Sequence, residues 1–122
     1  MSADEITLTL PRERPFFAVA HLVLGGLAVR LDLSVDQLED LRVALDELLG
    51  QHETEQDVTL TVRVDDGELE TVVGPFDESM TSELERGGDG VGLRRVLETV
   101  MDKVEVTERA GRPWVALTKA VT

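Results

Sequence analysis

The chain has 122 residues, a length that suits one domain. Its 25 acidic and 12 basic residues give a formal charge of −13, which argues against nucleic acid or an anionic membrane surface as a partner, because both would repel it. Hydrophobic residues make up 42% of the chain, enough for a packed core. No cysteine is present, which excludes disulfides, cysteine-ligated zinc and thiol catalysis. With no apolar leader at the start, we expect a cytoplasmic protein.

The N-terminal half predicts one strand followed by two helices. Residues 5–10 alternate apolar and polar side chains, which is typical of a strand with one buried face. Apolar residues then recur at spacings of three and four over residues 16–31, on more than one side of the predicted helix. That distribution predicts a helix buried between a sheet and a second layer. Ser34 and Gln37 form a capping-box pattern, and the apolar stripe that follows, from Val35 onward, runs to Gly50.

The C-terminal half predicts two hairpins separated by a third helix. Residues 58–73 alternate around a tight turn at 65–67. Residues 75–90 show no periodic apolar pattern and are predicted to be a loop. A helix follows over residues 91–101, and the closing hairpin has its turn at 110–112. Its return strand carries Trp114 and Ala116 as the apolar, packing positions, with Leu117 as a further candidate.

The order of the predicted elements is strand, helix, helix, strand, strand, helix, strand, strand. Four of the five strands come in hairpins, so we expect a mixed, mostly antiparallel sheet with three helices on one face. The predicted fold class is α+β, a two-layer sandwich. Residues 1–122 show no repeat or low-complexity tract and are predicted to form a single domain.

A glycine pattern opens the predicted third helix, with glycine at every second position from residue 88 to 92. Backbone N–H groups of glycines at a helix N-terminus can approach an anion, and the helix dipole favours phosphate there. Arg94 and Arg95, one turn further, would add positive charge. A flexible loop leading into a helix explains the same pattern about equally well.

Glu47 is the second candidate, because it lies next to the apolar stripe of the second helix, near Leu45 and Leu48. A partly buried carboxylate can act as a general base. A solvated helix glutamate is the simpler alternative. His21, on a largely apolar helix, is interpreted as a hydrogen-bonded structural histidine or an exposed rim residue rather than a catalytic one.

A helix with Asp46-Glu47-Leu48-Leu49, then a hairpin, a loop and Gly-x-Gly-x-Gly at a helix start, resembles the GHKL (Bergerat-fold) ATPases. Within that superfamily the whole chain is similar to the small anti-sigma factor serine kinases. The resemblance implies a histidine-kinase-like ATPase fold with Glu47 as the catalytic base. It implies that Gln51 stands where the family has a Mg²⁺-binding asparagine. The implied phosphate-binding residues are Gly88, Gly90, Gly92 and Leu93.

Two of the family's three motifs depart from its pattern. Gln51 is one carbon longer than the family's asparagine, and octahedral Mg²⁺ tolerates misplaced ligands poorly. The second motif normally begins with an aspartate that hydrogen-bonds adenine, but here the strand runs into Gly74-Pro75-Phe76, with no aspartate until Asp77 and no Asp-x-Gly-x-Gly. A site that lacks such a polar partner loses much of its discrimination. The third motif, residues 88–93, is well preserved.

The resemblance implies an anti-sigma factor-like regulatory protein that binds a sigma factor and an anti-anti-sigma partner, with weak or lost ATP binding. The acidic surface suits the basic faces of sigma factors. The alternative is an active ATP-dependent protein-serine kinase that phosphorylates the anti-anti-sigma factor, using ATP and Mg²⁺ as cofactors. A third interpretation is a Bergerat-fold remnant with an unrelated partner. The family also implies a homodimer through the first strand and helix, with Phe16 or Phe17 exposed there.

Overall fold

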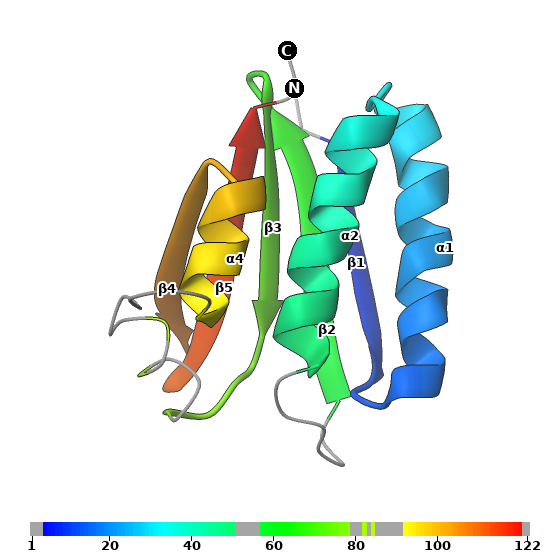
Figure 1. Cartoon of the computed structure of the whole chain (residues 1–122). Helices are drawn as coiled ribbons and strands as arrows, with labels where there is room; N and C mark the ends of the chain where they lie inside the picture. Colours follow the sequence, from blue (N-terminus) through cyan, green and yellow to red (C-terminus); the bar gives the residue numbers. More distant parts are fainter. Residues whose placement is uncertain (1–3, 51–56, 79–81, 83, 85–91, 121–122) are drawn as a thin grey trace.

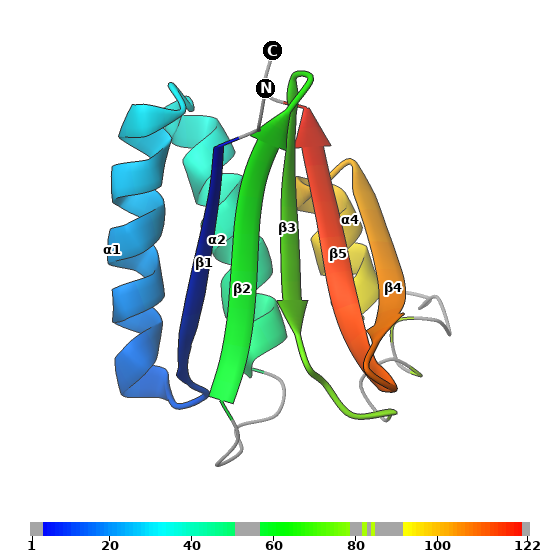
Figure 2. The ribbon, with the colours of Figure 1, turned by 180° about the vertical axis from the view of Figure 1, so that it is seen from behind.

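The computed structural model describes residues 4–50, 57–78, 82, 84 and 92–120. Five strands form one sheet, and the helices of the described residues cover one face of it, so that the molecule has two layers (Figure 1). The opposite face of the sheet is open (Figure 2). The elements are β1 (Asp4–Pro11), α1 (Arg14–Arg30), α2 (Val35–Gly50), β2 (Asp57–Asp65), β3 (Glu68–Gly74), α4 (Leu93–Val100), β4 (Lys103–Arg109) and β5 (Arg112–Ala120).

The strands are ordered β1-β2-β3-β5-β4, and every neighbouring pair is antiparallel. The predicted α+β class and the helices on one face are confirmed, and the sheet proves antiparallel throughout. The last hairpin, β4–β5, is added to the sheet through β5, which leaves β1 and β4 as the two edge strands.

Both hairpins turn on two residues with positive φ. Asp66 and Gly67 have φ values of 55° and 78°, and Ala110 and Gly111 have values of 53° and 76°. This pattern is that of a type I′ turn, whose twist matches the strands that it joins. The turns set the register of the sheet, because each one pairs the two residues beside it.

The core lies between the sheet and the helices, and among the described elements α2 contributes the largest number of fully buried large side chains. The buried leucines of α2 have at most 1% of their surface exposed. They are Leu41, Leu45, Leu48 and Leu49. The capping box is confirmed, since the Ser34 backbone N–H donates to Gln37 Oε1 at 2.8 Å and the Gln37 N–H donates to Ser34 Oγ at 3.1 Å. Val35 was wrongly included in the buried stripe, because it is 77% exposed beside the cap.

The prediction that the first helix is buried on more than one side is wrong. α1 lies beside β1 at the end of the sheet and packs on α2 and β1 (Figures 1 and 2). Only the residues facing these elements are buried. They are Ala20, Leu24, Leu27 and Ala28. The outer side is apolar and exposed, since Leu22 is 77% and Val29 is 83% exposed.

Two further predictions need correction. Within the stretch predicted to be a loop, the described residues Glu78, Ser82 and Leu84 have helical backbone, and Leu84 is fully buried. On β5, the buried side chains are Val115 and Leu117. Because side chains alternate along a strand, Trp114 and Ala116 lie on the open face instead. The predicted third helix begins at Leu93, and Val91 lies outside the described residues.

Candidate functional site

Glu47 lies in the last turns of α2, the helix that packs against both α1 and α4. Its neighbours Leu45 and Leu48 are fully buried, whereas Glu47 itself is half-buried. The structure therefore places the carboxylate at the margin of the core, as the helical spacing predicted. This position suits a group that reacts with a bound molecule and suits an ordinary helix-surface glutamate equally.

The residue next to Glu47 joins α2 to α1. Asp46 Oδ1 accepts a hydrogen bond from His21 Nε2 at 2.7 Å. The other ring nitrogen, Nδ1, lies 3.5 Å from Arg42 Nη2, which can donate to it when the histidine is neutral. His21 is thus a hydrogen-bonded structural residue, as interpreted from the sequence.

The start of α4 is where the family resemblance places the phosphates. Gly92 is the N-cap residue of α4, with extended backbone at φ −75° and ψ 167° and with no side-chain cap. Leu93, the next residue, is buried in the core, so its backbone rather than its side chain remains for a ligand. Gly88, Gly90 and Gln51 lie outside the described residues.

Arg94, which was expected to add charge for a phosphate, has protein partners for its guanidinium group. Its Nε donates to Glu98 Oε2 at 3.2 Å, and Nη1 donates to the Leu84 carbonyl at 3.0 Å. Nη2 reaches the Val104 carbonyl at 3.4 Å. These contacts tie α4 to β4 and to the segment before the helix. Arg95 is exposed.

The end of β3 is where the family has its adenine-reading aspartate. Here Gly74 and Pro75 are joined by a cis peptide bond, and Phe76 is 2% exposed within the core. The Phe76 N–H donates to the Pro113 carbonyl at 2.8 Å, which holds the segment against β5. An aromatic core residue thus follows the strand after which the resemblance implies a carboxylate, and Asp77 is the next residue.

Arg12 completes this cluster, and sequence reasoning missed it. The guanidinium carbon lies 4.8 Å from the centre of the Phe76 ring, and Nη2 donates to the Pro75 carbonyl. Arg12 is only 3% exposed, and its Nε has no hydrogen-bond partner in the described part of the chain. Burial lowers the pKa of Arg12, the Asp77 carboxylate opposes that shift and the Arg112 charge adds to it. In the sequence, the one indication of this role was the position of Arg12, a charged residue between a strand and a helix with proline in its first turn.

These residues do not fit the adenine-binding pattern of the family. Gly74, Pro75 and Phe76 carry no carboxylate that could accept a hydrogen bond from the amino group of adenine, and the first carboxylate after β3 is that of Asp77. Among the described residues, no group of three or more histidine or acidic side chains is arranged to hold a metal ion.

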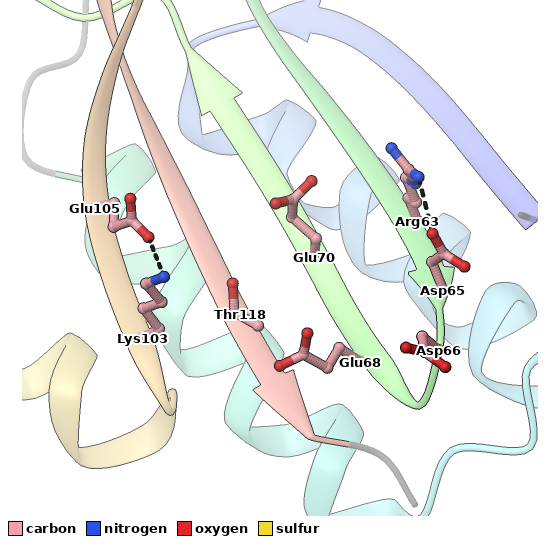
Figure 3. A pocket seen from close by; sticks show the side chains of 8 residues that line it. All are labelled: Arg63, Asp65, Asp66, Glu68, Glu70, Lys103, Glu105 and Thr118. Atoms are coloured by element: carbon pink, nitrogen blue, oxygen red, sulfur yellow. Dashed lines mark hydrogen bonds and ion pairs between the residues drawn. The ribbon is translucent and has the colours of Figure 1, made fainter.

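The open face of the sheet, on the side away from the helices, carries a depression of about 420 Å³, whose lining residues are drawn in Figure 3. Ion pairs lie on either side of it, Lys103 Nζ with Glu105 Oε1 at 2.7 Å and Arg63 Nη2 with Asp65 Oδ2 at 3.0 Å. Glu68 and Glu70 project between them (Figure 3). The depression is shallow and acidic, and it joins none of the residues predicted for the site.

Comparisons with known proteins connect the chain to one family, although no family model matches it. It is 31% identical to the serine-protein kinase RsbW of Bacillus velezensis, over 97% of this chain and 86% of that protein. It is 33% identical to RsbW of Listeria monocytogenes, over 84% of this chain and 79% of that protein.

A solved structure shows the same fold. The crystal structure of the RsbU and RsbW domains of Rv1364c from Mycobacterium tuberculosis superposes with a TM-score of 0.73 at 13% identity. The match covers 97% of this chain and 32% of that one, so the chain spans about a third of the solved protein. No helix in the described ranges has the length and apolar character needed to cross a membrane. By its similarity to the curated kinases over most of both lengths, the chain belongs to the RsbW family of serine-protein kinases.

Proposed function

We propose that this chain is an anti-sigma factor-like regulatory protein that binds a sigma factor and an anti-anti-sigma partner in the cytoplasm, with weak or lost ATP binding. The observation that supports weak or lost ATP binding is the contact between Arg12 and Phe76 at the end of β3. A buried ring and a buried cation stand at the end of the strand after which the resemblance implies an adenine-reading carboxylate, and this supports the proposal.

The formal charge of −13 supports the protein-binding part of the proposal, because opposite charge accelerates encounter with the basic surface of a sigma factor.

Calorimetric titration with ADP and ATP, with and without Mg²⁺, tests the loss of nucleotide binding. We expect no heat up to millimolar nucleotide from the folded protein, while RsbW of Bacillus velezensis under the same conditions serves as the positive control. Micromolar binding that Gly92→Val weakens would contradict the proposal. Co-purification with purified sigma factors in nucleotide-free buffer tests the proposed binding of a sigma factor. We expect a stable complex without ATP.

A second candidate, the active protein-serine kinase, is favoured by the names of the relatives. In that case Glu47 is the base, and Gln51 with Gly88, Gly90, Gly92 and Leu93 holds Mg²⁺ and the phosphates. A phosphotransfer assay with an anti-anti-sigma substrate distinguishes the two. Activity that Glu47→Gln abolishes and the surface control Asp36→Asn preserves would establish the kinase.

We also propose a homodimer through β1 and the outer side of α1. Phe16, Val19, Leu22 and Val29 are exposed apolar residues of this helix. Phe17, expected to be exposed, packs partly on the core, so Leu22 is the better position for a test. Leu22→Asp should yield monomers in sedimentation, whereas an unchanged dimer would exclude this face.

A further inference from the structure

Two neighbouring rows of side chains on the open face of the sheet are almost free of charge. Each row takes one residue from every strand, because paired residues lie side by side and every second residue of a strand faces the same way. The first row is Thr7, Thr61, Val72, Ala116 and Glu105, and the second is Thr9, Thr59, Gly74, Trp114 and Thr107. We call these two rows the neutral band. Glu105 is its single charged member, and depletion of charge is typical of the centre of a protein–protein interface.

The threonines of β1 and β2 in the neutral band bond to one another. Thr7 Oγ1 and Thr61 Oγ1 lie 3.2 Å apart, and Thr9 Oγ1 and Thr59 Oγ1 lie 2.8 Å apart, so each pair shares a hydrogen bond. A hydroxyl group that is already hydrogen-bonded within the protein can be covered at little cost in free energy.

Trp114 supplies an aromatic group at the β5 end of the neutral band. Its ring lies over Gly74, and the guanidinium carbon of Arg109 lies 5.5 Å from the ring centre. Tryptophan and arginine are the residue types that most often anchor protein interfaces. The open face therefore combines a centre that is cheap to cover with an anchoring ring.

An acidic border follows the neutral band on the side of the turn at 66–67. It consists of Glu5, Arg63, Glu70, Thr118 and Lys103, with Asp65 and Glu68 beyond them. Figure 3 shows all of these side chains except that of Glu5. The two cations of the border are already paired, Arg63 with Asp65 and Lys103 with Glu105.

Three carboxylates of the acidic border remain for a ligand. Glu5, Glu68 and Glu70 are exposed and form no hydrogen bond or ion pair in the described part of the chain. The hydrogen bond and the charge of Glu105 raise the pKa of Lys103, burial opposes this, and Glu68 and Glu70 add to the increase. The border therefore favours positive charge, and the depression of about 420 Å³ leaves room for a further cation.

The dimensions of the rows match one helix. A row that crosses the five strands spans four strand spacings, or about 19 Å, which is the length of about 13 helical residues. Neighbouring rows on one face are about 7 Å apart, so the occupant must present an apolar and a basic stripe side by side. An amphipathic helix does so, whereas an extended strand turns alternate side chains to opposite faces.

We propose that the open face of the sheet is a docking surface for a basic, amphipathic helix of a partner protein. The apolar side of the helix would lie on the neutral band against Trp114, and its basic side would face Glu5, Glu68 and Glu70. A second copy of the chain fits less well, because each copy carries a formal charge of −13 and like charges repel. The inference requires neither nucleotide binding nor a sigma factor as the partner, so it can fail separately from the proposed function.

A defined peptide tests the docking, and Trp114, the single tryptophan, reports it. The probe is the acetylated and amidated peptide Lys-Leu-Ala-Lys-Ala-Leu-Lys-Lys-Ala-Leu-Lys-Ala-Leu. Its control has the same residues in an order that distributes lysine around the helix. We expect saturating probe to reduce the quenching of Trp114 by acrylamide at least twofold, and the control to bind at least fivefold more weakly. Amide chemical shifts should change at Val72 and Ala116 and remain unchanged at Leu22 and Val29 of α1.

Substitutions in the protein test the two parts of the surface separately. Glu68→Gln combined with Glu70→Gln should weaken binding of the probe at least fivefold. The matched control, Asp32→Asn combined with Asp36→Asn, removes two exposed carboxylates from the helix side and should bind within twofold of the original protein. Asparagine tolerates the positive φ of residue 32. Ala116→Lys places a cation in the neutral band and should weaken binding at least tenfold.

Three results would overturn the proposal. Equal losses in the two double variants would show attraction by total charge alone. Chemical-shift changes confined to Leu22 and Val29 would show that the exposed side of α1 binds the helix instead. A dimer in sedimentation that Ala116→Lys dissociates would show that a second copy occupies the open face.

Discussion

The guanidinium of Arg12 stacks on the ring of Phe76 at 4.8 Å, and the two side chains join the end of β1 to the segment after β3. Both are almost completely buried, and Arg12 also donates to the carbonyl of Pro75. A buried arginine with an unpartnered Nε is costly unless its other contacts compensate. The stack and the carbonyl bond therefore hold the end of β1 against the segment that follows β3.

Removal of the Arg12 contacts should destabilise the fold. Arg12→Ala leaves the Pro75 carbonyl unpaired and the Phe76 ring uncovered, and we expect a loss of about 1–3 kcal/mol in the free energy of unfolding. Urea denaturation measures it. Arg12→Met keeps an unbranched apolar side chain over the ring and should recover part of the loss. A value for Arg12→Ala within about 0.5 kcal/mol of the original protein, the range of ordinary surface substitutions, would show that the cluster is not structural.

A side chain at Gly74 should disturb the sheet, because Trp114 lies directly over this glycine. A Cβ atom there would lie 2.5 Å from Trp114 Cδ2. We expect Gly74→Ala to cost about 1–3 kcal/mol, as overpacking does, and to shift the fluorescence of Trp114, the single tryptophan.

The matched control is Gly26→Ala in α1, where a Cβ would meet nothing within 4 Å. Alanine in a helix is more favourable than glycine by about 0.5–1 kcal/mol, so this variant should gain stability. Similar effects at both positions would contradict the close contact with Trp114.

The capping box at the start of α2 should contribute measurably to stability. Ser34→Ala removes the acceptor for the Gln37 N–H, and loss of such a cap costs about 1 kcal/mol. Ser34→Asp retains a capping oxygen and should remain near the original stability. Equal losses in the two variants, measured by thermal and urea unfolding, would mean that the hydrogen bond is unimportant.

The ion pair on the open face predicts a dependence on alkaline pH. The hydrogen bond and the charge of Glu105 raise the pKa of Lys103 above its ordinary value of 10.5, burial opposes this slightly, and Glu68 and Glu70 add to the increase. The protonated lysine is favoured in the folded state, so its stabilisation is complete below pH 10.5 and is lost as the pH rises through the raised pKa.

The measurement compares the unfolding free energy of the original protein with that of Lys103→Met from neutral pH to about pH 12. The difference should be constant at first and shrink at the alkaline end. Glu105→Gln, which removes the main cause of the shift, should reduce this dependence. A difference that grows with pH would contradict the assigned sign.

Local patterns in the sequence were sufficient for most of the elements. Alternation predicted the strands around the turns at 65–67 and 110–112, and the Ser34–Gln37 pattern predicted the start of α2. The helix through Glu47 and the helix start at Gly92 were also found, because helical periodicity and glycine placement depend on neighbouring residues. The roles of Glu47 and Gly92 stay predictions.

Only the tertiary structure decided which apolar and charged residues are covered. The exposed side of α1 and the burial of Leu84 depend on where these elements lie relative to the sheet, and periodicity alone does not contain that information. Likewise Arg12 and Phe76 are 64 positions apart and meet only because β1 and β3 end at the same side of the sheet. The sequence by itself determined the elements, since their causes are local, whereas burial and long-range contacts arise from packing between distant segments.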